Sequence, residues 1–220
     1  MSAAWWRVAG KDVRVELRSR ATLVPALLTG LLVVVVGLLA FHDLPERGMV
    51  AAGVLWIGLA FAGALGLARA FGAERDRGTL DVLLTLPVER GHVYLGKVAA
   101  SFATILLVAL VLVPVYLVAG GEPVPLQWPG LLLVLTLGAL GLAATGTMMS
   151  ALASGARGRE TLLPVLLVPV LVPLLLASVH ATQDALAGLP FARWRAEVLV
   201  LVGYDLAFLA ASTLLFEWGV

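Results

Sequence analysis

Residues 98–119 read V-A-A-S-F-A-T-I-L-L-V-A-L-V-L-V-P-V-Y-L-V-A and contain no charged side chain. A helix needs about 20 predominantly apolar residues to cross the roughly 30 Å hydrocarbon core of a bilayer. Five further runs have similar length and composition, at residues 21–41, 49–68, 129–153, 161–179 and 198–216. The sequence therefore predicts an all-α membrane protein with six transmembrane helices.

The composition excludes a water-soluble domain. Hydrophobic residues make up 61% of the 220 residues and charged residues only 13%, which is too little charge for a surface in water. The six runs leave no room for a separate globular domain, so we expect one transmembrane domain over 1–220. The absence of cysteine excludes disulfides, thiolate metal sites and cysteine nucleophiles.

Basic residues predict the orientation in the membrane. Twelve of the fifteen Lys and Arg residues precede the first run or lie between the second and third or the fourth and fifth runs, whereas Arg47, Arg193 and Arg195 fall in the alternate loops. By the positive-inside rule the loops rich in Lys and Arg are cytoplasmic. We therefore expect both termini in the cytoplasm.

The first 20 residues are predicted to form a cytoplasmic amphipathic helix, over about residues 3–18. One stripe of this helix is basic and the other carries apolar residues: Arg7, Lys11, Arg14 and Arg18 on the first, Trp6, Val13 and Leu17 on the second. Such a helix suits the headgroup layer of a membrane. The alternative is a charged leader that only fixes the topology.

Small residues recur at every fourth position in two of the runs. They are Gly58, Ala62, Gly66 and Ala70 in the second run, and Ala139, Ala143, Thr147, Ala151 and Gly155 in the fourth. Ridges of small residues let helices approach closely in lipid. They predict a compact bundle and leave open a homodimer seam.

The fifth run carries Pro164, Pro169 and Pro173. Each proline removes a backbone donor and clashes with the preceding turn, so we expect this helix to be kinked or locally unwound. It is either a moving part or a static kink. After it, residues 180–197 are too polar to span, and their Gly, Pro and aromatic residues predict an extracytoplasmic, partly re-entrant segment.

The polar segment at 71–91 contains F-G-A-E-R-D-R-G-T-L-D-V-L-L-T-L-P-V over residues 71–88. Thr79 can cap a short helix that presents leucines on one face and ends at Pro87. An apolar face between charges of both signs suits docking into a groove on a partner protein. The alternative is a loop that only connects two spans.

Residues 91–97, G-H-V-Y-L-G-K, match the start of a phosphate-binding loop. That loop requires Ser or Thr next and a position between a strand and a helix. Val98 follows here, at the entrance to an apolar run. We therefore expect that the chain is not itself an ATPase or another enzyme.

Polar residues within or beside the runs are few. His42 and His180 both fall at the outer ends of runs, where they are weak candidates for haem contact or simply solvated side chains. No cluster of metal-ligating residues accompanies them. Asp205 lies inside the sixth run, where an acid must face protein or a water-filled cavity. It has either a functional role or a packing role.

Three longer patterns carry a resemblance to a known family. Residues 71–87 follow F-x-x-E-x-x-x-G-T-L-D-x-L-L-x-x-P and 91–97 follow G-x-x-Y-x-G-K. Residues 162–173 follow L-L-P-x-L-L-x-P-x-x-x-P. Together with the number of runs, these patterns resemble the CcmB family, the permease subunit of the haem-exporting ABC transporter of cytochrome c maturation, which has the fold of ABC-2 type exporter permeases.

The resemblance implies a bacterial inner-membrane permease that dimerises and pairs with a separate ATP-binding subunit (CcmA-like). It implies three further partners: a haem-handling membrane protein (CcmC-like), a small single-span subunit (CcmD-like) and a periplasmic haem chaperone (CcmE-like). The implied ATPase-coupling residues are Glu74, Arg77, Gly78, Thr79, Leu80, Asp81, Leu83, Leu84 and Pro87.

In this reading the chain binds no cofactor itself. ATP and magnesium belong to the ATP-binding subunit, and haem is handled through the partners. Two alternatives stay open at this point: an ABC-2 type exporter for another amphipathic substrate, and an assembly scaffold that transports nothing.

Overall fold

The computed structural model describes residues 4–19, 22–41, 43, 47–70, 90–120, 128–154 and 159–217. This part of the chain folds into seven α-helices: α1 (Ala4–Ser19), α2 (Leu23–Ala40), α3 (Arg47–Ala70), α6 (Arg90–Gly120), α7 (Trp128–Ser154), α8 (Arg159–Leu186) and α9 (Phe191–Glu217). Six of them, α2 to α9, are long and apolar enough to cross a membrane. The prediction of an all-α membrane protein with six such helices is confirmed.

Helix α6 begins earlier than the sequence predicts, at Arg90 instead of residue 98. The predicted start at residue 98 follows from the polar residues that precede the apolar run. In the structure these first two turns are helical because Val93 and Tyr94 are buried in the bundle and α1 packs against α6. The pattern at 91–97 is therefore helical, so its backbone N–H groups cannot form a phosphate-binding loop.

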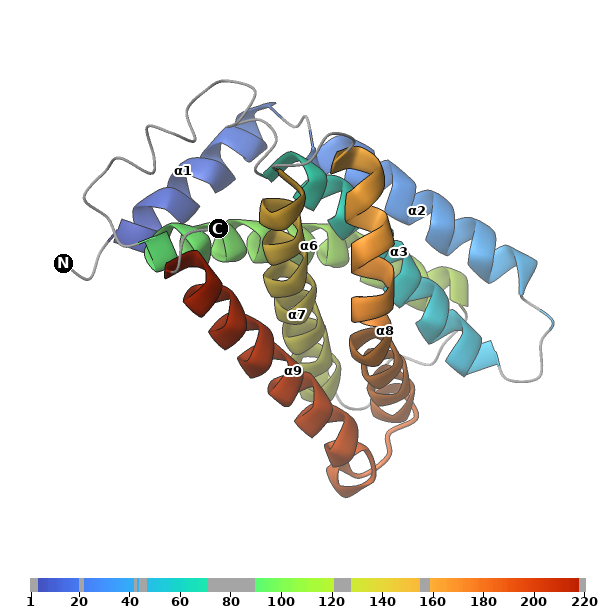
Figure 1. The fold of residues 1–220 in the computed structure, drawn as a ribbon. Helices are drawn as coiled ribbons and strands as arrows, with labels where there is room; N and C mark the ends of the chain where they lie inside the picture. The colour runs from blue at the N-terminus through green and yellow to red at the C-terminus, as the bar shows by residue number, and fades with distance from the viewer. Residues whose placement is uncertain are drawn as a thin grey trace.

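Helix α7 lies at the centre of the bundle (Figure 1). It packs against α3, α6, α8 and α9, whereas α2 lies at the edge against α3 and α6. No charged residue occurs in α7, and its inward positions are small residues, hydroxyls and leucines. An apolar helix without charges, rich in small residues, suits a position that meets several neighbouring helices.

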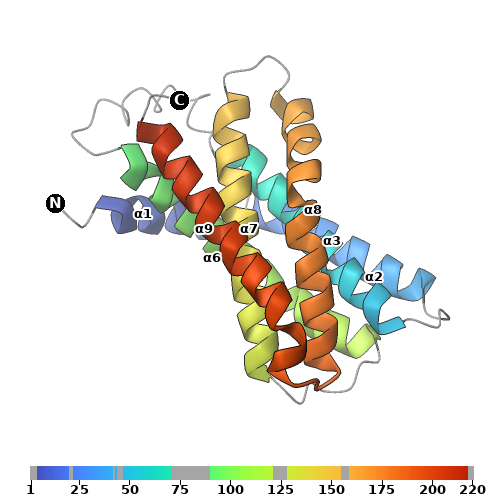
Figure 2. The ribbon, with the colours of Figure 1, turned by 60° about the horizontal axis from the view of Figure 1, so that its bottom comes forward.

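The helices cross the bundle in alternate directions (Figure 2). Helix α1 lies at the end of the bundle where α2, α6 and α8 begin and where α3, α7 and α9 finish; we call this the α1 end. The turn between α8 and α9 lies at the opposite end. Six crossings place the start of the first span and the end of the last span at the same end of the bundle.

Close approach between α2 and α3 depends on glycine. A Cβ atom added to Gly58 would lie 3.3 Å from the Gly30 carbonyl oxygen and 2.9 Å from Val34. Ala62, Ala139 and Ala143 are also buried within the bundle. These members of the ridges therefore pack between helices of one chain, and a homodimer seam along the ridges stays a prediction.

Helix α8 continues through all three prolines of the fifth run without a break, so local unwinding there is not observed. Residues 180–197 do not form a segment of their own, contrary to prediction. They comprise the last turns of α8, a turn at 187–190 in which Gly188 has φ 69°, and the first turns of α9. The buried indole of Trp194 closes this turn by donating to the Leu189 carbonyl oxygen at 3.2 Å.

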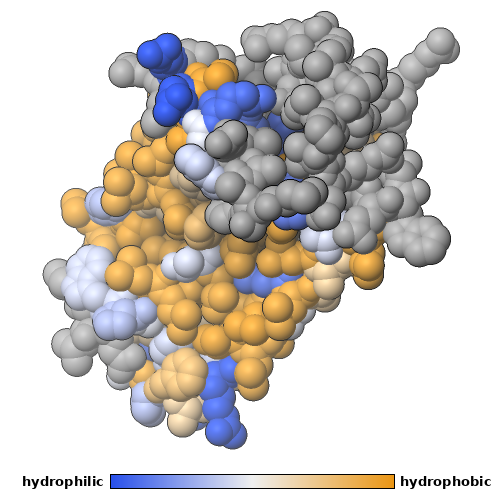
Figure 3. All heavy atoms as spheres, turned by 90° about the vertical axis from the view of Figure 1, so that its left-hand side faces the viewer, coloured by the Kyte–Doolittle hydropathy of each residue, from blue (hydrophilic) through white to orange (hydrophobic). Residues whose placement is uncertain are grey.

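The outward face of the bundle is apolar. Figure 3 shows a broad hydrophobic surface on one side of the molecule, with polar residues mostly toward its two ends. Large exposed side chains include Leu28, Leu32, Leu39, Leu110, Leu199 and Leu206. Such a surface is stable only where lipid or another membrane protein covers it.

Candidate functional site

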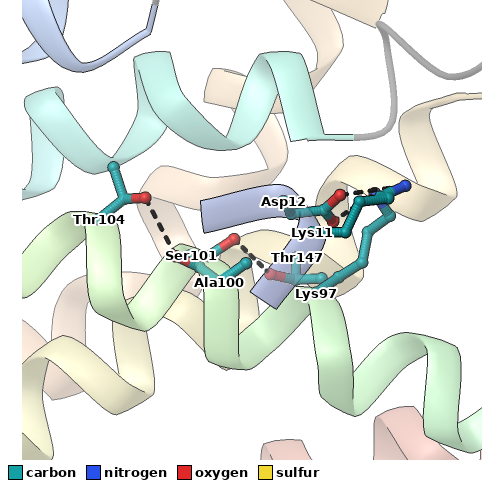
Figure 4. A network of polar contacts seen from close by, with 7 residues as sticks. All are labelled: Lys11, Asp12, Lys97, Ala100, Ser101, Thr104 and Thr147. Atoms are coloured by element: carbon teal, nitrogen blue, oxygen red, sulfur yellow. Dashed lines mark hydrogen bonds and ion pairs between the residues drawn. The ribbon is translucent and has the colours of Figure 1, made fainter. Parts of the chain in front are cut away.

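A charged contact attaches α1 to the bundle. The Lys97 ammonium lies 3.2 Å from Asp12 Oδ2, and Lys97 is only 3% exposed. Lys11 contacts the other oxygen of the same carboxylate, also at 3.2 Å (Figure 4). Because a buried ammonium needs a hydrogen-bonded counter-charge, the Asp12 contact fixes where α1 lies on α6.

A second acid of α1, one turn further on, holds the start of α2. Glu16 Oε1 accepts hydrogen bonds from the backbone N–H groups of Thr22 at 2.9 Å and Leu23 at 2.7 Å. The first N–H groups of a helix lack partners within the helix, and an acidic group there is favoured by the helix dipole. Helix α1 is thus connected to both α6 and α2 at the α1 end.

Hydroxyl groups join α6, α7 and α3 nearby. The Tyr94 hydroxyl donates to the Ala144 carbonyl oxygen at 3.0 Å, and Ser150 donates to the Leu67 carbonyl oxygen at 2.7 Å. Thr147 and Ser101 approach each other at 3.4 Å, one turn along α6 from Lys97 (Figure 4). Together with the contacts of α1, these hydrogen bonds connect α1, α2, α3, α6 and α7 at and near the α1 end.

A separate contact joins α3 to the end of α8. Trp56 donates from Nε1 to the Thr182 hydroxyl at 2.9 Å, and both side chains are buried. Gly138 of α7 leaves the space that the indole ring occupies. This contact packs α3, α7 and α8 together and presents no reactive group.

Asp205 occupies the seam of α7, α8 and α9. It is 3% exposed, so the prediction that this acid faces protein is confirmed. Within the described part of the chain neither carboxyl oxygen has a hydrogen-bond partner. A Cβ atom at Gly141 of α7 would lie 2.7 Å from Oδ1 and 2.5 Å from Leu174 of α8, so the carboxyl group is held in close packing.

The neighbouring hydroxyl of Tyr204 both donates and accepts a hydrogen bond. It donates to the Val170 carbonyl oxygen at 3.1 Å and accepts from the Thr145 hydroxyl at 2.9 Å. Helices α7, α8 and α9 therefore meet at one tyrosine, directly beside an acid that has no such partner.

A model of the family described as "CcmB protein" matches residues 3–217. The chain belongs to the CcmB family. It is similar to heme exporter protein B of Rhodobacter capsulatus, with 32% identity over 140 residues, or 64% of each chain. It is also similar to heme exporter protein B of Paracoccus denitrificans, with 33% identity over 159 residues, which cover 70% of this chain and 72% of the relative.

Most of the predicted site of this CcmB-family chain cannot be placed. Residues 74–87, which hold the predicted coupling residues, and His42 lie outside the described residues. His180 is exposed on α8. Among the described residues no three His, Cys, Asp or Glu side chains gather in a way that could hold a metal ion.

The two residues of the charged contact at the α1 end carry no motif that singles them out in the sequence. Lys97 is the last residue of the pattern at 91–97, and Asp12 lies among the basic residues of α1. The available signal was weak: a lysine next to an apolar run, and one acid among the basic residues of an amphipathic helix. Because these residues are 85 positions apart, only the packing of α1 on α6 brings them together.

Proposed function

We propose that this chain is the membrane permease subunit of an ABC transporter that handles haem in cytochrome c biogenesis. ATP hydrolysis by a separate subunit would drive haem export or the release of a haem-loaded periplasmic chaperone. The observation that carries the proposal is the CcmB family match over nearly the whole chain. It agrees with a bundle of six apolar helices and with the helical backbone at 91–97.

The α1 end is the cytoplasmic end in this proposal, in a bacterial inner membrane. The support comes from the Lys and Arg residues before α2, between α3 and α6, and between α7 and α8, all of which are connections at this end. Both termini of the chain then face the cytoplasm, where ATP is available to a partner.

Coupling to ATP hydrolysis would enter through the segment at 71–91. This segment joins α3 to α6 at the α1 end, and its last two residues already belong to α6. Asp12 and Glu16 of α1 connect the beginning of α6 to the beginning of α2. A force on the segment would therefore reach α6 directly and α2 through α1.

The partners in this proposal are those that the family resemblance implies: the CcmA-like, CcmC-like, CcmD-like and CcmE-like proteins. ATP and magnesium would be bound by the first of them, and haem through the others. A second membrane subunit, which the sequence predicts to be another copy, would pack on an outward apolar face because several members of the small-residue ridges are already buried inside the chain.

The test is deletion of the gene followed by complementation, with purification of the tagged chain from native membranes in mild detergent. We expect loss of c-type cytochromes in the deletion strain, and co-purification of an ATP-binding subunit and a haem-containing membrane protein. Normal c-type cytochromes in the deletion strain would overturn the haem assignment. An ATP-binding subunit without haem proteins would support an exporter for another substrate, and the absence of any ATP-binding subunit would support a scaffold.

A further inference from the structure

Asp205 lies in the middle of a candidate membrane span. The span in α9 covers Phe191–Leu215, so Asp205 is about 15 Å of helix from the cytoplasmic end at a rise of 1.5 Å per residue. An acid at this depth is far from the headgroups and from bulk water. Its burial and its lack of any hydrogen-bond partner in the described residues are therefore two separate signs that it is unusual.

Among the residues that the structure describes, no charged side chain of the packed helices is hydrogen-bonded to the Asp205 carboxyl oxygens. Helix α7 contains no ionisable residue. On α8, His180 and Asp184 are about 9 and 15 Å along the helix from Leu174, toward the opposite end. On α9 itself, Glu197 is about 12 Å from Asp205 along the helix axis. The Tyr204 hydroxyl donates its hydrogen bond to the Val170 carbonyl oxygen. Arg193 and Arg195 of α9 lie still further from Asp205 than Glu197, and Arg159 and Glu160 lie at the first turn of α8.

Helix α6 also packs against α9 and carries ionisable groups of its own. Lys97 sits at the α1 end with its ammonium on Asp12. The Tyr94 hydroxyl donates to the Ala144 carbonyl oxygen, and His92 lies still closer to the start of α6. None of these groups contacts the Asp205 carboxyl oxygens.

The packing also limits what the carboxyl group can bind. Gly141 is close enough that even a methyl group there would press on Oδ1 and on Leu174. A hydrated ion or an organic ligand would have to displace α7 or α8, whereas a proton needs no space. A proton also removes the charge whose burial without a partner is so costly.

We propose that Asp205 is a proton-binding site in the middle of the transmembrane bundle. It carries its proton while α7, α8 and α9 pack as in this structure. It releases the proton to water only when α9 separates from α7 and water reaches the carboxyl group. The second statement rests on the proposed function, because it requires a bundle that moves during transport; the first does not.

Infrared spectroscopy tests the first statement on the full chain in lipid vesicles. Aspartate labelled with ¹³C at the side-chain carboxyl shifts the C=O stretch of a protonated acid away from the unlabelled signal. We expect such a band at pH 7, absent in Asp205→Asn and retained in the matched control Asp184→Asn. The absence of the band in the wild type, or its persistence in Asp205→Asn, overturns the proposal.

A second variant protects the test against misfolding. Asp205→Glu keeps a carboxyl group but removes residue 205 from the labelled aspartates, so it should lose the same band. The release step is tested on the complex with its ATP-binding subunit, by adding a non-hydrolysable ATP analogue. We expect the band to weaken. An unchanged band overturns the release step. The spectrum without the analogue still tests whether Asp205 is protonated, and that test does not depend on the proposed function.

Discussion

Lys97 and Asp205 are equally buried, at 3% exposure each, but only Lys97 contacts an opposite charge. Lys97 lies near the start of α6, where the surface helix α1 can bring Asp12 to within 3.2 Å. Asp205 lies at mid-span, beside a helix α7 that carries no charged residue and beside the Tyr204 hydroxyl, which is bonded to Thr145 and Val170. The depth in the bundle thus decides whether a buried charge obtains a partner.

This difference assigns different roles to the two regions. The α1 end is a network of paired charges and backbone hydrogen bonds that connects three helices, which suits transmission of force. The middle holds one acid that packing favours in its neutral form. The predictions below separate these roles, from the largest expected effect to the smallest.

Asp205→Arg places a permanent charge at mid-span and should destabilise the protein strongly. Insertion scales give about 2.5–3.5 kcal/mol for such a charge at a helix centre. Asp205→Asn mimics the neutral acid and should leave the free energy of unfolding almost unchanged. Denaturant unfolding in detergent compares the two, and equal destabilisation by both variants would show that the negative charge itself is required.

Asp12→Ala removes the carboxylate that pairs with the buried Lys97 ammonium. The expected cost is about 1–3 kcal/mol, the range for a buried polar group that loses its partner. Most of this should be recovered in the double variant Asp12→Ala/Lys97→Met. The matched control is Lys11→Ala, which affects an exposed contact to the same carboxylate and should cost well under about 1 kcal/mol.

If Asp12→Ala unfolds at the same denaturant concentration as the wild type, α1 is not held by this contact. Lys97 could then no longer serve as the example of a buried charge that its partner stabilises, and the comparison with Asp205 would fail. A double variant as unstable as Asp12→Ala would point instead to packing lost at position 12.

Glu16→Ala removes the acceptor for the first two N–H groups of α2. We expect a loss of about 1 kcal/mol, typical for the removal of a helix cap. Glu16→Gln keeps an acceptor oxygen and should recover much of that loss. Hydrogen exchange at the start of α2 gives the local readout, and equal exchange in the wild type and Glu16→Ala would contradict the contact.

Tyr204→Phe should have the smallest effect, about 0.6 kcal/mol, the average for hydrogen bonds between helices in a membrane protein. Thr145→Val removes a hydrogen bond to the same hydroxyl. The two substitutions together should cost less than their sum because they share one interaction. Strict additivity in thermal unfolding would indicate that the Thr145–Tyr204 contact contributes nothing.

Much of the fold followed from the sequence because lipid imposes a simple rule. Apolar runs of about 20 residues become helices, and an acid within one must face inward. The helix ends were less predictable: α6 begins before its apolar run, where α1 packs against it, and α8 continues past residue 179 to Leu186, directly before the turn at 187–190.

The contacts between helices could not be predicted. Trp56 and Thr182 are 126 residues apart, and nothing local to either residue indicates the other. The ridges of small residues predicted close packing but gave no information about whether the neighbouring helix belonged to the same chain. The segment at 71–91 was the most informative stretch for the family. The coupling role of residues 74–87 within it stays a prediction.

The most direct test of the account is charge reversal at the α1 end, with ATP hydrolysis and c-type cytochrome production measured in the same strains. We expect Asp12→Lys and Lys97→Asp each to permit assembly with the ATP-binding subunit while ATP hydrolysis no longer supports cytochrome production. The double variant Asp12→Lys/Lys97→Asp should restore production. Wild-type production in both single variants would contradict a coupling route through α1, and so would a double variant that assembles but stays inactive.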